Sequence, residues 1–121
     1  SISAFVYDYD HNAPTPEHLE MTHRKFFEIV RKAHPSIPVI ILTRPDFDWN
    51  PEDSIKRRAV IYDTYQTAVK NGDRNVYFID GQSFFGMFGR EECTIDGCHP
   101  TSLGFMRMAE RVYLLLKDIL K

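Results

Sequence analysis

The 121-residue sequence lacks both a large excess of charge and a long apolar stretch. It carries 15 Lys and Arg residues against 17 Asp and Glu residues, which gives a formal net charge of -2. This balance provides no electrostatic reason to expect nucleic acid as a partner, because nucleic-acid-binding domains usually carry a basic surface. No apolar run approaches the roughly 18 residues of a membrane-spanning helix. We therefore expect one folded domain with neither a nucleic-acid nor a membrane partner.

Cysteine is also scarce, since the chain contains only Cys93 and Cys98. The sequence leaves two interpretations open, a pair of reduced thiols or a local disulfide. A disulfide would require an oxidising compartment, so the localisation is unassigned, with a secreted or periplasmic location favoured. The spacing of the two cysteines lacks the second ligand pair of a structural zinc site. We expect no metal site and no cofactor.

No secretory signal is visible at the start, where the sequence opens directly in the strand-like run Ile2–Tyr7. Natural proteins usually have some lead-in before a first buried strand. We expect that the amino-terminal part of a longer protein precedes these residues.

Strand-like and helix-like segments alternate along the chain. Each of the first two helices is predicted by a polar N-cap residue followed by proline, Thr15-Pro16 and Asn50-Pro51. The apolar residues Ile55, Ala59, Tyr62, Tyr65 and Val69 are expected to face the core from the second helix. The predicted elements are strand 3–9, helix 16–34, strand 37–42, helix 51–71, strand 76–79, a helical turn in 82–88 and helix 101–120. This order predicts an α/β fold in which a parallel sheet of about three strands has helices on both faces.

Polar residues follow each predicted strand. They are Asp8 to Asn12 after the first strand, Thr43-Arg44 after the second, Asp80 after the third, and Asp96 with His99 further on. Ligands of parallel α/β sheets bind outside the carboxyl ends of the strands. The convergence of these segments on one edge predicts a functional site there.

The strongest chemical signal is Asp96-Gly97-Cys98-His99, an Asp-x-x-His loop before the last helix. A carboxylate that accepts one imidazole N–H fixes the tautomer and leaves the other ring nitrogen free to move a proton. Such a base needs a nucleophile and a donor for the developing oxyanion, and the side-chain amide of Asn12 is a candidate donor. None of the serines lies in a Gly-Asp-Ser or Gly-x-Ser-x-Gly turn.

Residues 96–109 resemble the last conserved block of the SGNH (GDSL-type) esterases and acylhydrolases, in which Asp-x-x-His-Pro precedes a helix. Residues 6–14 resemble the Asn-bearing block of that family, although the usual Gly-x-Asn-Asp is replaced here by Asp10-His11-Asn12-Ala13. The family fold is a flavodoxin-like α/β/α sandwich with about five parallel strands. The resemblance therefore implies that 1–121 is the carboxyl-terminal part of a single SGNH domain, without its nucleophile block.

The resemblance implies that His99 is the base, Asp96 its orienting acid and Asn12 an oxyanion donor. His11 and Arg44 are weaker candidates for substrate binding. The implied substrate is a small ester such as an acylated carbohydrate, with no cofactor. The nucleophilic serine is expected upstream, so these residues alone are expected to be inactive, and the sheet edge left exposed is expected to promote self-association.

Two other functions compete. A strand that ends in Asp8 and Asp10 resembles the nucleophile motif of haloacid-dehalogenase-like Mg²⁺-dependent phosphatases, with Thr43 as the phosphate ligand. Asn12 stands where that family has a small or β-branched residue, and the Asp96–His99 loop is left without a role. The second alternative is a degenerate SGNH domain that acts as a binding module.

Overall fold

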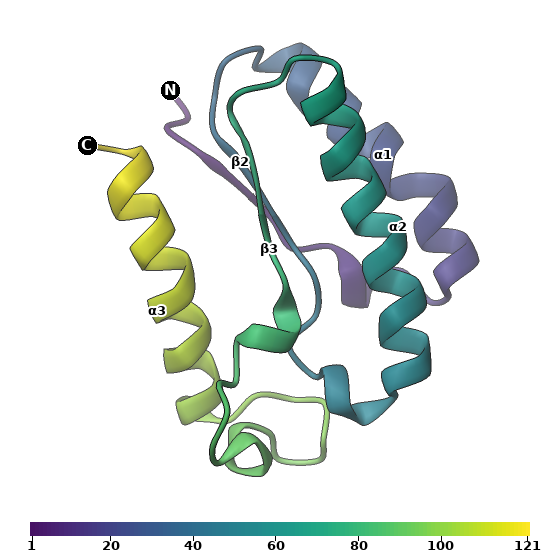
Figure 1. The fold of residues 1–121 in the computed structure, drawn as a ribbon, viewed down its shortest axis with the longest axis vertical. Coiled ribbons are helices and arrows are strands. Elements are labelled where there is room, and N and C mark those ends of the chain that lie inside the picture. The colour runs from purple at the N-terminus through teal and green to yellow at the C-terminus, as the bar shows by residue number, and fades with distance from the viewer.

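The alternating segments form a three-stranded parallel sheet between two helical layers, as the sequence predicts. The structure is a computed structural model that describes all residues, 1–121. In chain order its strands and helices are β1 (Phe5–Tyr7), α1 (Pro16–Ala33), β2 (Val39–Leu42), α2 (Pro51–Lys70), β3 (Val76–Ile79) and α3 (Ser102–Ile119). Figure 1 shows α1 and α2 together on one side of the strands and α3 alone on the other.

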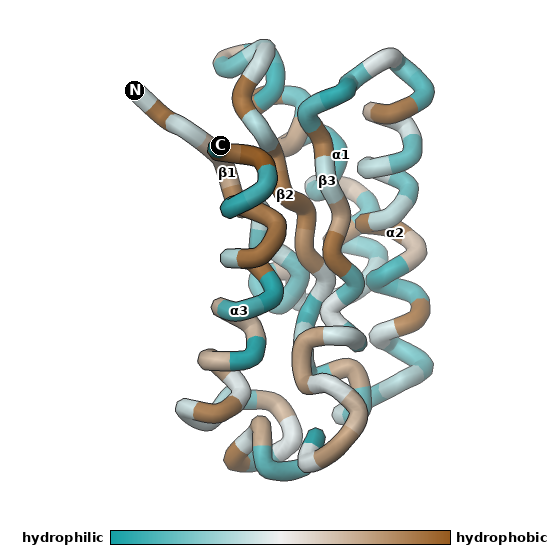
Figure 2. Tube along the Cα trace, turned by 60° about the vertical axis from the view of Figure 1, so that its left-hand side comes forward, coloured by the Kyte–Doolittle hydropathy of each residue, from teal (hydrophilic) through white to brown (hydrophobic).

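The sheet has the order β1-β2-β3, and both pairings are parallel. β2 is the central strand, and all four of its residues are buried, which explains its continuous apolar sequence. β2 and β3 are hydrophobic where they pass between the helices (Figure 2). β1 is shorter than the predicted 3–9, because the chain leaves the sheet after Tyr7 and turns into a 3-10 helix, η1 (Asp10–Asn12).

Alternate residues of the strands supply two separate cores. Val39 and Ile41 face α1 and α2, where they pack with Tyr7, Leu19 and Ile61. The other strand face packs against α3, and its core contains Ile40, Leu42, Ile79, Phe84, Phe85 and Cys93, covered by Met108, Val112, Leu115, Leu116 and Ile119. None of the helices is both long and apolar enough to cross a bilayer.

All three helices begin at capped residues. The side chains of Thr15, Asn50 and Thr101 each accept a hydrogen bond from a backbone N–H of the first turn. Three further 3-10 turns connect the strands to the helices: η2 (Phe47–Trp49), η3 (Gly81–Ser83) and η4 (Arg90–Cys93). These turns and η1 follow the carboxyl ends of the strands, so the sheet presents its loops together at one end.

His23 is a titratable group inside the core between α1 and the sheet. It is 0% exposed, stacks on Tyr7 with ring centroids 4.4 Å apart, and places Nδ1 2.8 Å from Thr64 Oγ1. Burial lowers the pKa of His23 to about 4, because the charged imidazolium loses its hydration there. In the unfolded chain the same histidine takes up a proton near pH 6.5.

The unfolded state therefore binds more protons than the folded state between about pH 6.5 and pH 4. We predict that His23 lowers the free energy of unfolding by up to about 3 kcal/mol as the pH falls through this window. Urea unfolding at a series of pH values measures the effect. His23→Gln, which cannot titrate, serves as the reference, and a wild-type-minus-variant difference that does not change with pH would contradict the prediction.

Candidate active site

The Asp96–His99 loop is held in shape by the carboxylate of Asp96. Oδ1 accepts the backbone N–H groups of Cys98 at 2.9 Å and His99 at 2.7 Å, and Oδ2 lies 2.6 Å from His99 Nδ1. A bridge between Thr94 and Pro100 closes the base of the loop. One side chain thus fixes both the backbone of the loop and the orientation of the imidazole.

These contacts determine the proton positions on the pair. The backbone N–H groups of His99 and Cys98, followed by the His99 side chain, hold the pKa of Asp96 well below its ordinary value. Asp96 is therefore an acceptor, and His99 Nδ1 carries the shared proton. His99 Nε2 makes no hydrogen bond within the chain, and the side chain is 76% exposed. The free nitrogen is available to accept a proton from a bound group.

Gly97 and Trp49 fix the position of this loop against η2. Gly97 adopts φ +90°, a conformation that side chains rarely tolerate, and a Cβ there would lie 2.4 Å from Trp49 Cε3. Glycine is required at this position for both reasons. Trp49 and Gly97 also line a groove of about 560 Å³ beside the loop, together with Asp46, Phe85, Arg90 and Ile95.

Asn12 lies on η1, a turn that is clamped from inside the protein. The guanidinium of Arg57 donates to the backbone carbonyls of Asp10 at 2.9 Å and Ala13 at 3.0 Å. The Asp10 carboxylate is 1% exposed and accepts the backbone N–H of Arg44 at 2.9 Å. Asn12 itself is exposed, and its side-chain amide makes no hydrogen bond within the chain. Buried hydrogen bonds therefore hold the turn in place, while the amide stays available as a donor.

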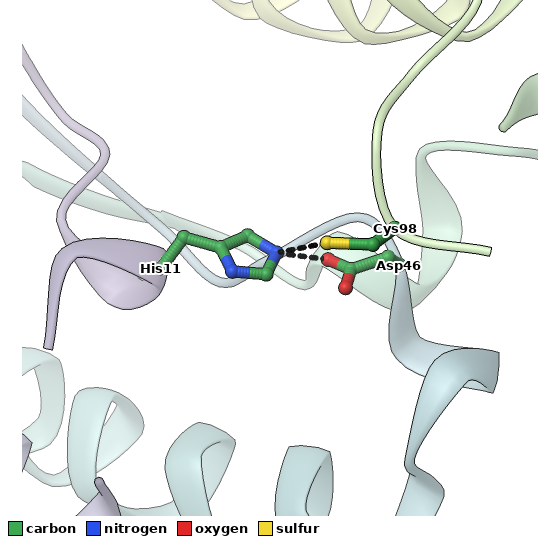
Figure 3. Close-up of side chains that lie close together, drawn as sticks. All are labelled: His11, Asp46 and Cys98. Carbon is green, nitrogen blue, oxygen red and sulfur yellow. Dashed lines mark hydrogen bonds and ion pairs between the residues drawn. The ribbon is translucent and has the colours of Figure 1, made fainter. Parts of the chain in front are cut away.

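His11 connects this turn to the Asp-x-x-His loop. Its Nε2 lies 2.5 Å from Asp46 Oδ1, in the loop after β2, and 3.9 Å from Cys98 Sγ (Figure 3). Cys98 is the residue before His99. The structure therefore brings the segments that carry Asn12 and His99 to the same end of the sheet, as the strand-end argument predicts.

The His11–Asp46 contact shifts the pKa values of both side chains. The hydrogen bond to Asp46 raises the pKa of His11 against the opposing effect of burial. Burial alone would raise the pKa of Asp46, but the hydrogen bond and charge of His11 outweigh it and lower that pKa. Burial and the nearby charge of Asp46 raise the pKa of the Cys98 thiol. Both cysteines are free thiols in the structure.

Arg44 does not fit its expected part in substrate binding. The residue is 6% exposed, its Nη1 lies 3.1 Å from Asp53 Oδ2, and its Nε and Nη2 donate to Ser54 Oγ at 3.1 and 2.8 Å. The guanidinium is therefore occupied inside the protein, where it fastens the loop after β2 to the first turn of α2. His11 remains 44% exposed, with its Nε2 engaged by Asp46.

The carboxylates proposed for a phosphatase are not a free pair. Asp10 is buried, with Oδ1 3.3 Å from Arg57 Nη1 and Oδ2 bonded to the backbone of Arg44, whereas Asp8 is exposed. Thr43 Oγ1 accepts the backbone N–H of Gly81 at 2.6 Å. Because Asp10 and Thr43 serve internal contacts, the geometry does not favour a Mg²⁺-dependent phosphatase.

Asp46 and Cys98 were not identified from the sequence. The position of the strand ends indicates which loops meet at the edge of the sheet, but not which of their side chains point toward one another. His11 and Asp46 are 35 residues apart, and His11 and Cys98 are 87 apart, so no local spacing pattern connects them.

Comparisons with known proteins give consistent results. Residues 1–117 match the sequence model of the GDSL-like lipase/acylhydrolase family. A solved structure described as a GDSL-like lipase from Bacteroides ovatus superposes with a TM-score of 0.80 and 29% identity, over 99% of this chain and 36% of that one. A salicylyl-acyltransferase from a tetracycline biosynthetic pathway gives a TM-score of 0.73 at 19% identity, over 97% of this chain and 38% of that one, and shows likeness of fold. No curated protein sequence shows significant similarity. The chain thus spans little more than a third of the length of these two structures.

Proposed function

This chain belongs to the GDSL-like lipase/acylhydrolase family, and from that premise we propose that it carries the base and acid of a serine-type ester hydrolase. The observation that carries the proposal is the Asp96–His99 pair, with Oδ2 2.6 Å from Nδ1 and Nε2 free. In this mechanism His99 Nε2 takes the proton of an attacking hydroxyl and returns it to the leaving alcohol. Asp96 keeps the tautomer fixed and stabilises the imidazolium that forms.

Asn12 is proposed as an oxyanion donor. Attack on an ester places negative charge on the carbonyl oxygen, and a preorganised N–H donor stabilises that charge more than it stabilises the neutral ester. The clamped turn and the unengaged amide of Asn12 suit this role. The turn also reaches the Asp-x-x-His loop through His11 and Cys98.

The attacking serine is proposed to lie outside these 121 residues. No serine of the chain makes a hydrogen bond with His99, and Ser54 and Ser83 bond to Phe47 and Asp80 instead. The substrate is proposed to be a small ester, such as an acylated carbohydrate. The groove beside Trp49 combines aromatic, aliphatic and charged side chains, which suits a partly polar ester.

We predict that Asn12→Ala lowers kcat for p-nitrophenyl acetate hydrolysis by the intact protein roughly 10²- to 10³-fold, because one oxyanion donor is lost. KM should change little, since the missing contact forms mainly in the transition state. Steady-state kinetics measure both constants. Asn71→Ala is the matched control, as Asn71 is an exposed residue at the far end of α2. An unchanged kcat in Asn12→Ala would exclude Asn12, whereas an intact protein that hydrolyses neither acetyl nor butyryl esters would favour a binding module.

A further inference from the structure

His11, Asp46 and Cys98 come from three different loops and place three metal-ligating atoms close together. His11 lies on η1, Asp46 in the loop after β2, and Cys98 in the Asp-x-x-His loop. The imidazole nitrogen, a carboxylate oxygen and the thiol sulfur all lie within 4.8 Å of one another. Figure 3 shows the imidazole edge of His11 directed at both the sulfur of Cys98 and the carboxylate of Asp46.

Hydrogen bonding alone leaves this cluster incompletely satisfied. His11 Nε2 carries at most one proton, yet it faces Asp46 Oδ1 at 2.5 Å and Cys98 Sγ at 3.9 Å. The second oxygen, Asp46 Oδ2, is buried without any hydrogen-bond partner, in a side chain that is 0% exposed. A buried carboxylate oxygen without a partner is costly, so it requires an explanation.

A catalytic relay does not provide that explanation. In a thiol–imidazole–carboxylate relay the acid binds one ring nitrogen and the thiol the other. Here both Asp46 and Cys98 approach Nε2. A single ring nitrogen cannot accept the thiol proton while it is hydrogen-bonded to the orienting carboxylate. A cation at the centre of the cluster would instead be contacted by all three groups.

We propose that His11, Asp46 and Cys98 bind a divalent transition-metal ion of the zinc class. Imidazole and thiolate favour zinc over magnesium or calcium, which prefer oxygen ligands alone. Neutral imidazole, carboxylate and thiolate carry two negative charges together, and these balance a divalent cation. On binding, the Cys98 S–H bond breaks and its proton leaves to the buffer. His11 Nε2 also gives up the proton that it shares with Asp46, so that the neutral imidazole keeps its proton on Nδ1 while Nε2 and the sulfur bond to the metal.

The three ligand atoms need only small movements to reach the separations of a tetrahedral zinc site. Tetrahedral zinc, with bonds of about 2.0–2.3 Å, holds its ligand atoms roughly 3.3–3.8 Å apart. The separation of sulfur and nitrogen, 3.9 Å, is already near that range. The 2.5 Å separation of nitrogen and oxygen must widen, which rotation of the Asp46 carboxylate permits. His11 and Cys98 are partly exposed, so an ion can enter from solvent, and water can fill the fourth position.

The metal would tie the turn that carries Asn12 to the loop that carries His99. None of the three ligands has a step in the proposed hydrolysis. Because metal binding is measured without substrate, failure of this proposal and failure of the proposed hydrolysis can be told apart.

Titration of the intact, metal-free protein with Co²⁺ and then with Zn²⁺ tests the proposal. We expect one Co²⁺ per chain, a thiolate-to-cobalt charge-transfer absorption, and displacement by Zn²⁺ with an apparent Kd on the order of 1 µM or tighter. Cys98→Ser should abolish the charge-transfer band. Asp46→Asn should weaken zinc binding by more than the roughly 10- to 100-fold that loss of an outer-shell partner costs. Cys93→Ala, which removes the other thiol, should retain both the charge-transfer band and the affinity for zinc.

Alkylation of the wild-type protein keeps the test independent of how the variants fold. Iodoacetamide should modify Cys98 in the metal-free protein, and Zn²⁺ should protect it, as followed by mass spectrometry of the peptides. Absence of both the charge-transfer band and the protection in the wild type would overturn the proposal. A band that persists in Cys98→Ser would do the same.

Discussion

His99→Ala is expected to lower ester turnover by the intact protein about 10⁴- to 10⁶-fold while the fold is retained. Removal of the imidazole leaves the attacking hydroxyl without a base, and losses of this size are typical when one member of a catalytic triad is removed. The side chain is 76% exposed and hydrogen-bonds only to Asp96, so its truncation leaves no cavity in the core. Steady-state hydrolysis of p-nitrophenyl acetate, with circular dichroism as the check on folding, measures the effect.

Asp96→Asn separates the orienting role from the loop-forming role. Asparagine retains a side-chain oxygen that can accept the N–H groups of Cys98 and His99, so the loop should keep its shape. It replaces the charged oxygen that faces Nδ1 with a neutral group, and the expected loss is about 10⁴-fold in kcat.

His18→Ala, an exposed position on α1, is the histidine control for His99→Ala. Wild-type turnover in His99→Ala would rule out His99 as the base.

The fold was predictable because its signals are local. Thr15-Pro16 and Asn50-Pro51 are caps whose hydrogen bonds form within one turn, so spacing alone locates both helix starts. The apolar run of β2 is typical of a strand that is covered on both faces. The ends of β1 and β2 differ from prediction because a strand ends where its neighbour stops pairing, and the sequence of one strand does not contain that information.

The buried face of α2 was predicted only in part, since Tyr65 packs against the core as expected. The apolar residues Ile55, Tyr62 and Val69 are 53%, 40% and 46% exposed. The residues that α2 buries are Ser54, Arg57, Ile61, Thr64 and Ala68, of which three are polar. Hydrophobic periodicity failed here because these polar side chains have partners in other elements, such as Arg44 for Ser54 and His23 for Thr64.

In the candidate site, too, only the contacts between residues close in sequence could be predicted. Asp96 and His99 are three residues apart, so their contact follows from a loop hydrogen-bonding pattern that the sequence displays. The contacts of Asp46 and of Arg57 depend on how loops and helices dock after the chain has folded. The sequence therefore indicated the Asp96–His99 pair that we propose as acid and base, while the supports of the neighbouring turn appeared only in three dimensions.

Arg57 is the main support of the turn that carries Asn12. Its Nη1 donates to two backbone carbonyls of that turn and lies 3.3 Å from Asp10 Oδ1, while its Nε donates to Asp53 at 2.7 Å. The Arg57 and Asp10 side chains are 6% and 1% exposed. Solvent therefore cannot replace these hydrogen bonds if the guanidinium is removed.

Arg57→Met is expected to lower the free energy of unfolding by about 3–5 kcal/mol, because the Asp10 carboxylate stays buried without its cation. Urea unfolding measures this loss. Arg24→Met is the matched control, since its ion pair with Asp63 is exposed and should contribute less than about 1 kcal/mol. Asp10→Asn combined with Arg57→Met should cost less than the sum of the single changes, because it removes the uncompensated charge. A loss in Arg57→Met no larger than that in Arg24→Met would mean that the turn is held by its own backbone, and the preorganisation of the turn that carries Asn12 would then need another source.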